Sequence, residues 1–348
     1  MSAAVQRLRG SVLSSPTASL INLVGLLVVA IVLVAALQRI YQGGMSFFLG
    51  ELGFGLAEGA IFALVALGYT MVYGIIELIN FAHGDVFTLG AFFSLSLMPL
   101  FGLQEGTSGG AGVILPLIGL FVVTMLFCAV VNVVIERVAY RPLRHAPRLA
   151  PLITAIGMSS LLEGLMYVWR GPYNLHYPDL LPEQQITIPG GASISVKAVF
   201  VIVIAFVLMV GLTLFINRSI LGKAMRATAQ DRDAAQLMGI NINRTIAATF
   251  FIGAALAGAG GIIYGLYYNS VSAFDGFQLG LFAFTAAVLG GIGNIPGAVL
   301  AGFLIGVVTS ISDGYFVTSW TRIVVYAILI FVLIFRPTGL LGMRVPEK

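Results

Sequence analysis

The sequence predicts an all-α, polytopic membrane protein with about 8–10 transmembrane helices, some of them broken or re-entrant. Three observations support this fold class. The 348-residue chain is 59% hydrophobic and only 9% charged, whereas a soluble domain usually has about 25% charged residues. Its apolar residues fall in runs close to the roughly 20 residues that cross a bilayer. Its Lys and Arg residues gather in alternate connections between these runs, as expected where they set the topology.

The apolar runs, taken in order, are the candidate spans. The first run could be taken for a signal peptide, but it is longer than the apolar region of one. Gln38-Arg39 follows it in place of a small-residue cleavage site, so we expect it to be retained. Two short runs, Val86–Phe101 and Leu279–Leu289, are candidates for half-helices, which would leave about eight full spans. The runs are Leu20–Leu37, Leu52–Tyr73, Val86–Phe101, Val113–Ile135, Leu152–Trp169, Ala198–Ile216, Ile246–Tyr268, Leu279–Leu289, Gly297–Ser312 and Arg322–Phe335.

The positive charges give this arrangement an orientation. If the N-terminus is inside, only Arg39, Arg170, Lys197 and Arg322 of the 18 Lys and Arg fall outside. We therefore expect the N- and C-termini and the segment 217–244 in the cytoplasm. The Pro- and Gly-rich connection 170–197 is expected outside. Its aromatic anchors near the membrane surface would be Trp169, Tyr173 and Tyr177.

Two polar or Gly-rich stretches interrupt the apolar pattern. The first contains Asn80, His83 and Asp85, with Gly84 as a hinge, and the second is the segment 289–297. Irregular backbone at membrane depth persists only where protein buries it or water reaches it. Paired interruptions in two halves of a transporter are typical of a substrate pathway, but both could equally be cytoplasmic turns between helices. The predicted pathway residues are Asn80, His83, Asp85, Gly290, Gly291, Gly293 and Asn294.

Small residues and acids inside the apolar runs predict close helix packing and polar contacts. Small residues spaced four apart let helices approach closely, within one chain or between two. Glu58 and Glu163 lie deep in their runs, where we expect a polar cavity or a subunit contact, whereas an interfacial position is favoured for Asp85. The glycine pairs are Gly55/Gly59, Gly261/Gly265, Gly293/Gly297 and Gly302/Gly306.

The longest polar segment with helical character is Asn217–Arg244, which carries five cations against two anions. Its apolar residues recur close to the helical period, so part of it is predicted to be an amphipathic helix that ends at Gly239. Such a segment is either a connector that lies on the membrane surface or a docking element for a soluble partner. The residues that set the period are Ile220, Ala224, Ala227, Ala234 and Met238.

Several chemistries are missing from the sequence. No G-x-x-x-x-G-K-[ST] motif is present, because Gly222-Lys223 is followed by Ala224 without the required earlier glycine. The single Cys128, expected to be a buried apolar residue, excludes an intrachain disulfide. His83, His145 and His176 fall in different segments, so no metal site is expected. We expect no catalytic residue and no bound cofactor, and the net charge of +4 indicates no nucleic-acid partner.

Five blocks of the sequence resemble, in family order, the permeases of the branched-chain amino-acid ABC importers, specifically the LivH-type subunit of the LivH/LivM group. The blocks cover most of the chain from about residue 50, so the resemblance divides the chain into an N-terminal extension with a first span (1–45) and a permease domain (46–348). They are Ala63–Phe92, Ile135–Arg144, Leu152–Ser159, Gly222–Asn241 and Phe284–Gly302.

The resemblance implies one transmembrane subunit of an importer in the bacterial plasma (inner) membrane. Its expected partners are a LivM-type permease, two cytoplasmic ATPases that bind ATP, an extracytoplasmic binding protein and membrane lipid. In such importers a cytoplasmic helix followed by glycine docks in a groove of the ATPase, and the segment 216–245 matches this coupling loop by position. The implied coupling residues are Ala227, Asp231, Ala234, Ala235, Leu237 and Gly239.

Two other functions remain open at the level of the sequence. The related urea and short-chain amide permeases share much of the pattern. A stand-alone, ion-coupled secondary transporter is a different class, and it would need acids paired with basic residues inside the membrane. The Lys and Arg of this chain lie almost entirely in the connections, which disfavours ion coupling.

Overall fold

The computed structural model describes residues 16–76, 78–105, 111–144, 146–147, 149–187, 193–336 and 338–342. For residues 16–43 and 111 it describes the backbone but not the side chains. The two chain ends and His145 lie outside the described residues, so the expectations for them are not addressed by the structure.

The described part of the chain is mostly helical, as predicted. Its long helices are connected by short 3-10 and π segments, η1 (Met98–Phe101), η2 (Glu136–Tyr140) and η3 (Arg141–Leu143). The helices are α2 (Pro16–Ile76), α3 (Ala82–Leu97), α4 (Ala111–Ile135), α5 (Leu149–Arg170), α6 (Val196–Arg218), α7 (Ile220–Gln230), α8 (Arg232–Leu237), α9 (Ile242–Tyr268), α10 (Asp275–Gly290), α11 (Ile295–Tyr315) and α12 (Thr318–Phe335).

Four short strands lie in the connections at one end of the bundle. Strand β1 (Leu175–His176) pairs antiparallel with β4 (Ser270–Val271), and β2 (Gln185–Thr187) pairs antiparallel with β3 (Ser193–Ser195). The first pair joins the connection after α5 to the connection after α9, two segments that are far apart in the sequence.

Eight helices in the described part of the chain are long and apolar enough to cross a membrane. The protein is therefore a multi-pass membrane protein, and the predicted fold class is confirmed. Helix α2 is divided at Gly44, whose φ of 80° and ψ of 158° break the helical backbone. The predicted run Leu279–Leu289 lies in α10, which at 16 residues is shorter than a span. The predicted run Val86–Phe101 becomes part of a 20-residue span, Ala82–Phe101.

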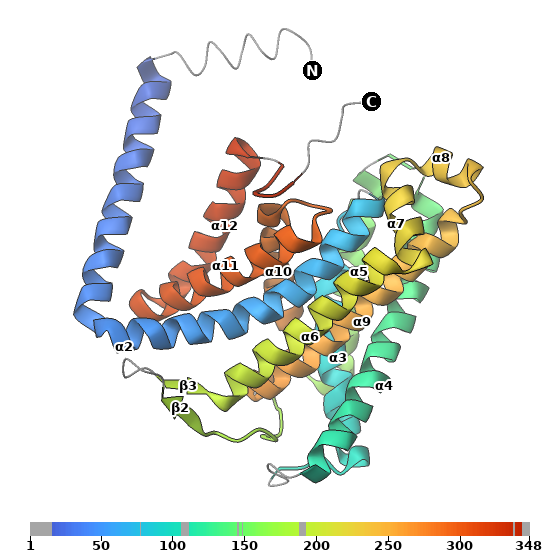
Figure 1. Ribbon diagram of the computed structural model, residues 1–348, viewed down its shortest axis with the longest axis horizontal. Helices are drawn as coiled ribbons and strands as arrows, with labels where there is room; N and C mark the ends of the chain where they lie inside the picture. The colour runs from blue at the N-terminus through green and yellow to red at the C-terminus, as the bar shows by residue number, and fades with distance from the viewer. Residues whose placement is uncertain are drawn as a thin grey trace.

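The core is built around the part of α2 after Gly44, which runs diagonally through the bundle between α10–α11 and α6–α9 (Figure 1). Glycines allow its neighbours to approach closely. A Cβ added at Gly55 would lie 2.7 Å from the Cα of Val307, and one at Gly59 would lie 2.6 Å from the Cα of Phe303. Both contacts join α2 to α11, so these predicted glycine pairs act within one chain.

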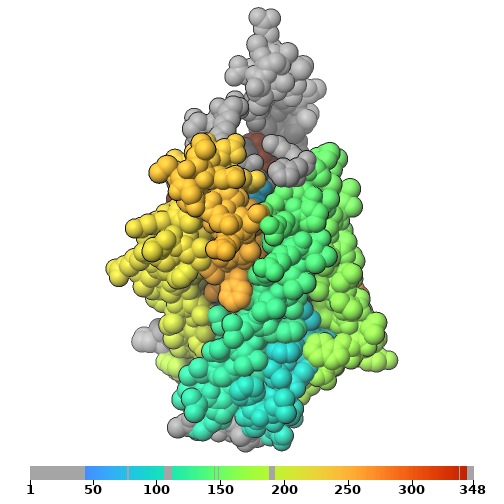
Figure 2. Space-filling view, turned by 90° about the vertical axis from the view of Figure 1, so that its right-hand side faces the viewer, coloured from blue at the N-terminus to red at the C-terminus, as the bar shows by residue number. Residues whose placement is uncertain are grey.

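Helices α4, α5, α6 and α12 form the outer surface. In the space-filling view, α4 crosses one face, with α7 and the start of α9 beside it (Figure 2). The exposed α4 side chains, such as Leu115 (77% exposed) and Ile118 (55%), are large and aliphatic. This composition suits contact with lipid tails.

The connections predicted to be cytoplasmic gather at one end of the bundle, opposite the strands (Figure 1). The Arg144 guanidinium donates to the side chain of Asn243 (2.6 Å), and the Asn294 amide donates to the Leu341 carbonyl (2.6 Å). The alternation of connections that the charges predicted is therefore consistent with the fold. Which end faces the cytoplasm stays a prediction.

Candidate functional site

The basic segment 217–244 forms two helices at the end of the bundle. Helix α7 begins after Ser219, whose Oγ accepts from the Gly222 amide (2.9 Å). The helix breaks at Asp231, which has extended backbone (φ −155°, ψ 115°). The Asp231 Oδ1 then caps α8 by accepting from the Asp233 amide (2.9 Å) and the Ala234 amide (3.0 Å). Gly239, with φ of 85°, ends this element at the residue where the sequence predicted it.

The break at Asp231 changes which side chains face outward. The helical spacing was counted from Ile220 to Met238, and these two residues are 86% and 83% exposed. The predicted amphipathic helix is present as α7, but the break at Asp231 places Met238 after a second helix. The inward face of α7 is formed by Gly222, Met225 and Thr228.

The residues expected to couple to an ATPase differ in exposure. Leu237 is 89% exposed, and Ala234 and Gly239 are also at the surface. Ala235 is only 4% exposed, so it packs α8 against the rest of the chain and presents no docking surface. Ala227 and Asp231 are half-buried.

A cavity of about 1050 Å³ lies beneath α8, lined also by the ends of α2 and α9. Arg232 ties α8 to the last turn of α2, since its Nη2 donates to the Ile75 carbonyl (2.8 Å). Arg144, on the cavity wall, forms an ion pair with Glu136. Burial lowers the pKa of the Arg144 guanidinium, an effect that the Glu136 charge opposes. The cations of this end therefore include structural ones, which hold the coupling segment in place.

The predicted pathway residues near the start of α3 are all buried, but they face different neighbours. The Asn80 Oδ1 accepts from the Tyr140 hydroxyl of η2 (2.6 Å). The His83 ring lies edge-on against the Tyr69 ring of α2, with centroids 5.0 Å apart. The Asp85 Oδ2 accepts from the Ser159 hydroxyl of α5. The three polar side chains therefore have different direct partners, and their place on a substrate pathway stays a prediction.

The structure corrects one expectation for this stretch and leaves another open. Asp85 is fully buried among helices, and the depth at which it lies in a membrane stays a prediction. Gly84 is no hinge, because α3 is continuous through it. A Cβ at Gly84 would lie 2.9 Å from the Cα of Gly280, so this glycine lets α3 and α10 pack closely.

The second interruption, 289–297, is the turn between α10 and α11. Gly291 and Gly293 have φ of 101° and 87°, a region that favours glycine. The end of the described chain covers this turn, because the Leu340 amide donates to the Leu289 carbonyl (2.7 Å). The predicted pathway residues Gly290, Gly291, Gly293 and Asn294 therefore lie at a turn between two helices, and their place on a substrate pathway stays a prediction.

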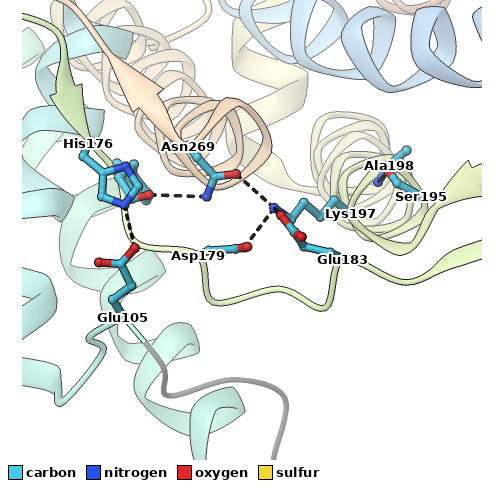
Figure 3. A network of polar contacts seen from close by, with 9 residues as sticks. Glu105, His176, Asp179, Glu183, Ser195, Lys197, Ala198 and Asn269 are labelled. Carbon is cyan, nitrogen blue, oxygen red and sulfur yellow. Dashed lines mark hydrogen bonds and ion pairs between the residues drawn. The ribbon is translucent and has the colours of Figure 1, made fainter.

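At the opposite end, a polar network joins three connections (Figure 3). The Lys197 Nζ at the start of α6 forms an ion pair with Asp179 (2.9 Å) and donates to the Asn269 Oδ1 (2.9 Å). The Asn269 amide in turn donates to the Tyr177 carbonyl (3.3 Å). Together these contacts fix the connection after α5 to the ends of α6 and α9.

Sequence reasoning missed this network. Tyr177, expected as a membrane-surface anchor, is fully buried, and its hydroxyl lies 2.8 Å from the Ser94 hydroxyl. Burial raises the pKa of Tyr177, so its hydroxyl stays neutral. A lone Lys at the start of an apolar run was the available signal for Lys197, but nothing in the sequence identified its partners.

A helical, multi-pass protein with an exposed, cation-rich segment at one end has the features of a membrane transport permease. Comparison with known proteins identifies the family. The family model for the branched-chain amino acid transport system/permease component matches residues 52–333. The chain belongs to this family, and the predicted LivH-type resemblance is confirmed.

Individual relatives agree with the family. The chain is 44% identical over 307 residues to the high-affinity branched-chain amino acid transport system permease protein BraD of Pseudomonas aeruginosa, covering 86% of this chain and 98% of BraD. It is 40% identical over 305 residues to the corresponding LivH of Escherichia coli, covering 87% and 98%. A probable LivH of Methanocaldococcus jannaschii is 28% identical over 311 residues, covering 82% and 92%. No solved structure matches the chain.

Proposed function

We propose that this chain is the transmembrane permease subunit of an ATP-driven importer in the bacterial inner membrane. It passes branched-chain, hydrophobic amino acids from an extracytoplasmic binding protein to the cytoplasm. The family match over residues 52–333 supports the transport class. BraD and LivH are permeases of high-affinity branched-chain amino acid transport systems, which favours branched-chain amino acids over urea or short-chain amides as the substrate.

The proposal assigns energy coupling to separate chains. Two cytoplasmic ATPase subunits bind and hydrolyse ATP, and a LivM-type permease completes the membrane part. This chain itself needs no cofactor. Movement of the coupling segment as the ATPases close rocks the two permeases, so that a passage opens alternately to each side.

The single observation that carries the coupling role is the apolar tip of the segment 217–244. Leu237 and Met238 are 89% and 83% exposed, directly before Gly239. Adjacent exposed apolar side chains on a charged, solvent-facing element are typical of a protein–protein contact. Exposed cations of the same segment, such as Arg244, can supply the polar rim that such contacts have.

A matched pair of variants tests the coupling role. In Leu237→Ser/Met238→Ser, we expect the tagged chain to lose co-purifying ATPase and leucine uptake by about tenfold or more, since apolar anchors dominate such contacts. Ile220→Ser removes an equally exposed apolar side chain from the start of α7, where we expect an effect below about twofold.

Two results would count against the coupling role. Wild-type recovery of ATPase with the Leu237→Ser/Met238→Ser variant would place the contact elsewhere. Leucine uptake by the chain in vesicles without any ATPase would point to a secondary transporter.

A further inference from the structure

The N-terminus of α10 lies inside the helical bundle, against α3. A Cβ at Gly276, the second residue of α10, would lie 2.7 Å from the Thr88 Oγ1 and 2.9 Å from the Cα of Asp85. The first N–H groups of a helix have no partner within the helix, and no side chain caps α10. The Asp275 carboxylate accepts from the Ser272 amide (2.7 Å), upstream of these N–H groups.

Two buried polar atoms at this place have no hydrogen-bond partner among the described residues. They are the Thr88 Oγ1 and the Asp85 Oδ1, and both side chains are 0% exposed. Thr88 and Asp85 are three residues apart on α3, so they share one face of the helix. An unpaired polar atom that is buried costs stability unless something binds it.

Asp85 also lacks a cation in the described part of the chain. None of the ion pairs formed by the described residues includes Asp85, and its nearby acid is Glu163 of α5. An unpaired carboxylate inside a membrane protein is expensive, and such groups usually face a ligand or a pathway. The hydrogen bond from Ser159 reaches Oδ2 and leaves the Asp85 Oδ1 without a partner.

Apolar side chains stand next to these polar groups. Tyr167 of α5 and Phe274, directly before α10, are in edge-to-face contact with ring centroids 5.0 Å apart. Phe274 is 56% exposed and Phe277 is 49% exposed. The place therefore combines the first N–H groups of α10, a hydroxyl, a carboxylate and partly exposed aromatic side chains.

These groups match the three parts of a hydrophobic amino acid. We infer that the α3–α5–α10 junction is a transient binding site for the substrate zwitterion, which forms when α3 and α10, closely packed in this structure, move apart and the Tyr167–Phe274 contact opens. The substrate ammonium binds the Asp85 carboxylate, and its carboxylate binds the N-terminal amides of α10 and the Thr88 hydroxyl. Its apolar side chain packs against Phe274 and Phe277. This inference rests on the proposed function and places the substrate at α3 and α10, away from the turn 289–297.

The test compares isosteric variants in the complete transporter. The chain offers matched controls, because Thr124 and Thr70 are also 0% exposed with no partner for their hydroxyls. We expect Thr88→Val to lower leucine uptake by about fivefold and Thr88→Ser to restore it, while Thr124→Val changes it by less than about twofold. Asp85→Asn should lower uptake by about tenfold or more. Each variant is checked for chain level and for co-purified ATPase.

The outcomes separate this inference from the proposed function. A wild-type transporter that moves no branched-chain amino acid overturns both. Normal wild-type transport with equal uptake by Thr88→Val and Thr124→Val overturns the site alone, as does normal uptake by Asp85→Asn. If the Asp85→Asn chain does not accumulate in the membrane, the three threonine variants still decide whether the substrate binds at this junction.

Discussion

The α2–α11 contact and helix α5 use glycine in opposite ways. Along α2–α11 the glycines meet backbone of the facing helix, as at Gly59, where a Cβ would lie 2.6 Å from the Cα of Phe303. On α5, a Cβ at Gly157 or Gly164 would meet nothing within 4 Å. The same residue type in two apolar helices therefore marks a closed contact in one region and an open surface in the other.

The difference teaches what glycine spacing can and cannot predict. Small residues at intervals of four permit close approach, but the sequence does not say whether a partner from the same chain is present. Helix α5 packs its inward face, with Ala155, Ser159 and Met166, against its own chain. Its outer face includes Ile153 (66% exposed) and Val168 (88% exposed), so we expect α5 to tolerate changes that α2 does not.

The largest expected effect comes from placing the same bulky residue in the two regions. In Gly59→Val, the new side chain meets backbone that cannot move away, so we expect a destabilisation of about 3 kcal/mol or more. Gly157→Val in α5 should cost less than about 1 kcal/mol. The measurement is the fraction of extracted chain that elutes as a single folded species. If the two variants lost equal fractions of folded chain, the glycines of α2 and α5 would not differ in how tightly they are packed.

Disruption of the polar network around Lys197 is expected to have the second-largest effect on stability. Lys197→Met leaves the Asp179 carboxylate and the Asn269 amide oxygen without their cation, with an expected cost of about 2 kcal/mol. Because the network fixes the connection after α5, limited proteolysis should cut residues 171–187 faster in the variant. We expect cleavage near α2–α11 to be unchanged. A uniform increase in cleavage along the chain would show that the network stabilises the whole bundle.

The smallest expected effect comes from adding a single methyl group to a glycine in each of the two regions. In Gly164→Ala the new Cβ enters open space, so the change in stability should stay within about 0.5 kcal/mol. Gly302→Ala adds the same atom 2.6 Å from the Cα of Ala63 and should lower the thermal unfolding midpoint by several degrees. A lower midpoint for Gly164→Ala than for Gly302→Ala would contradict the assignment of the two surfaces.

Much of the candidate site could be predicted because it depends on local chemistry. The segment 217–244 was found from its charge and from Gly239, which ends α8 where a glycine stop was expected. The stretch at Asn80, His83 and Asp85 was found because polar residues interrupt an apolar run. The inward face of α7, at Met225 and Thr228, was not identified, since it depends on which other helices α7 packs against.

The sequence by itself determined that this chain is a multi-pass helical protein, where most of its spans lie and how its connections alternate. These properties follow from the lengths of apolar runs and the positions of charges, which act locally along the chain. Only the tertiary structure decided that Asp85 lies beside Ser159 and near the start of α10, and that Lys197 meets Asp179 and Asn269. Such contacts join residues that are distant in the sequence, and helix packing alone sets which side chains meet.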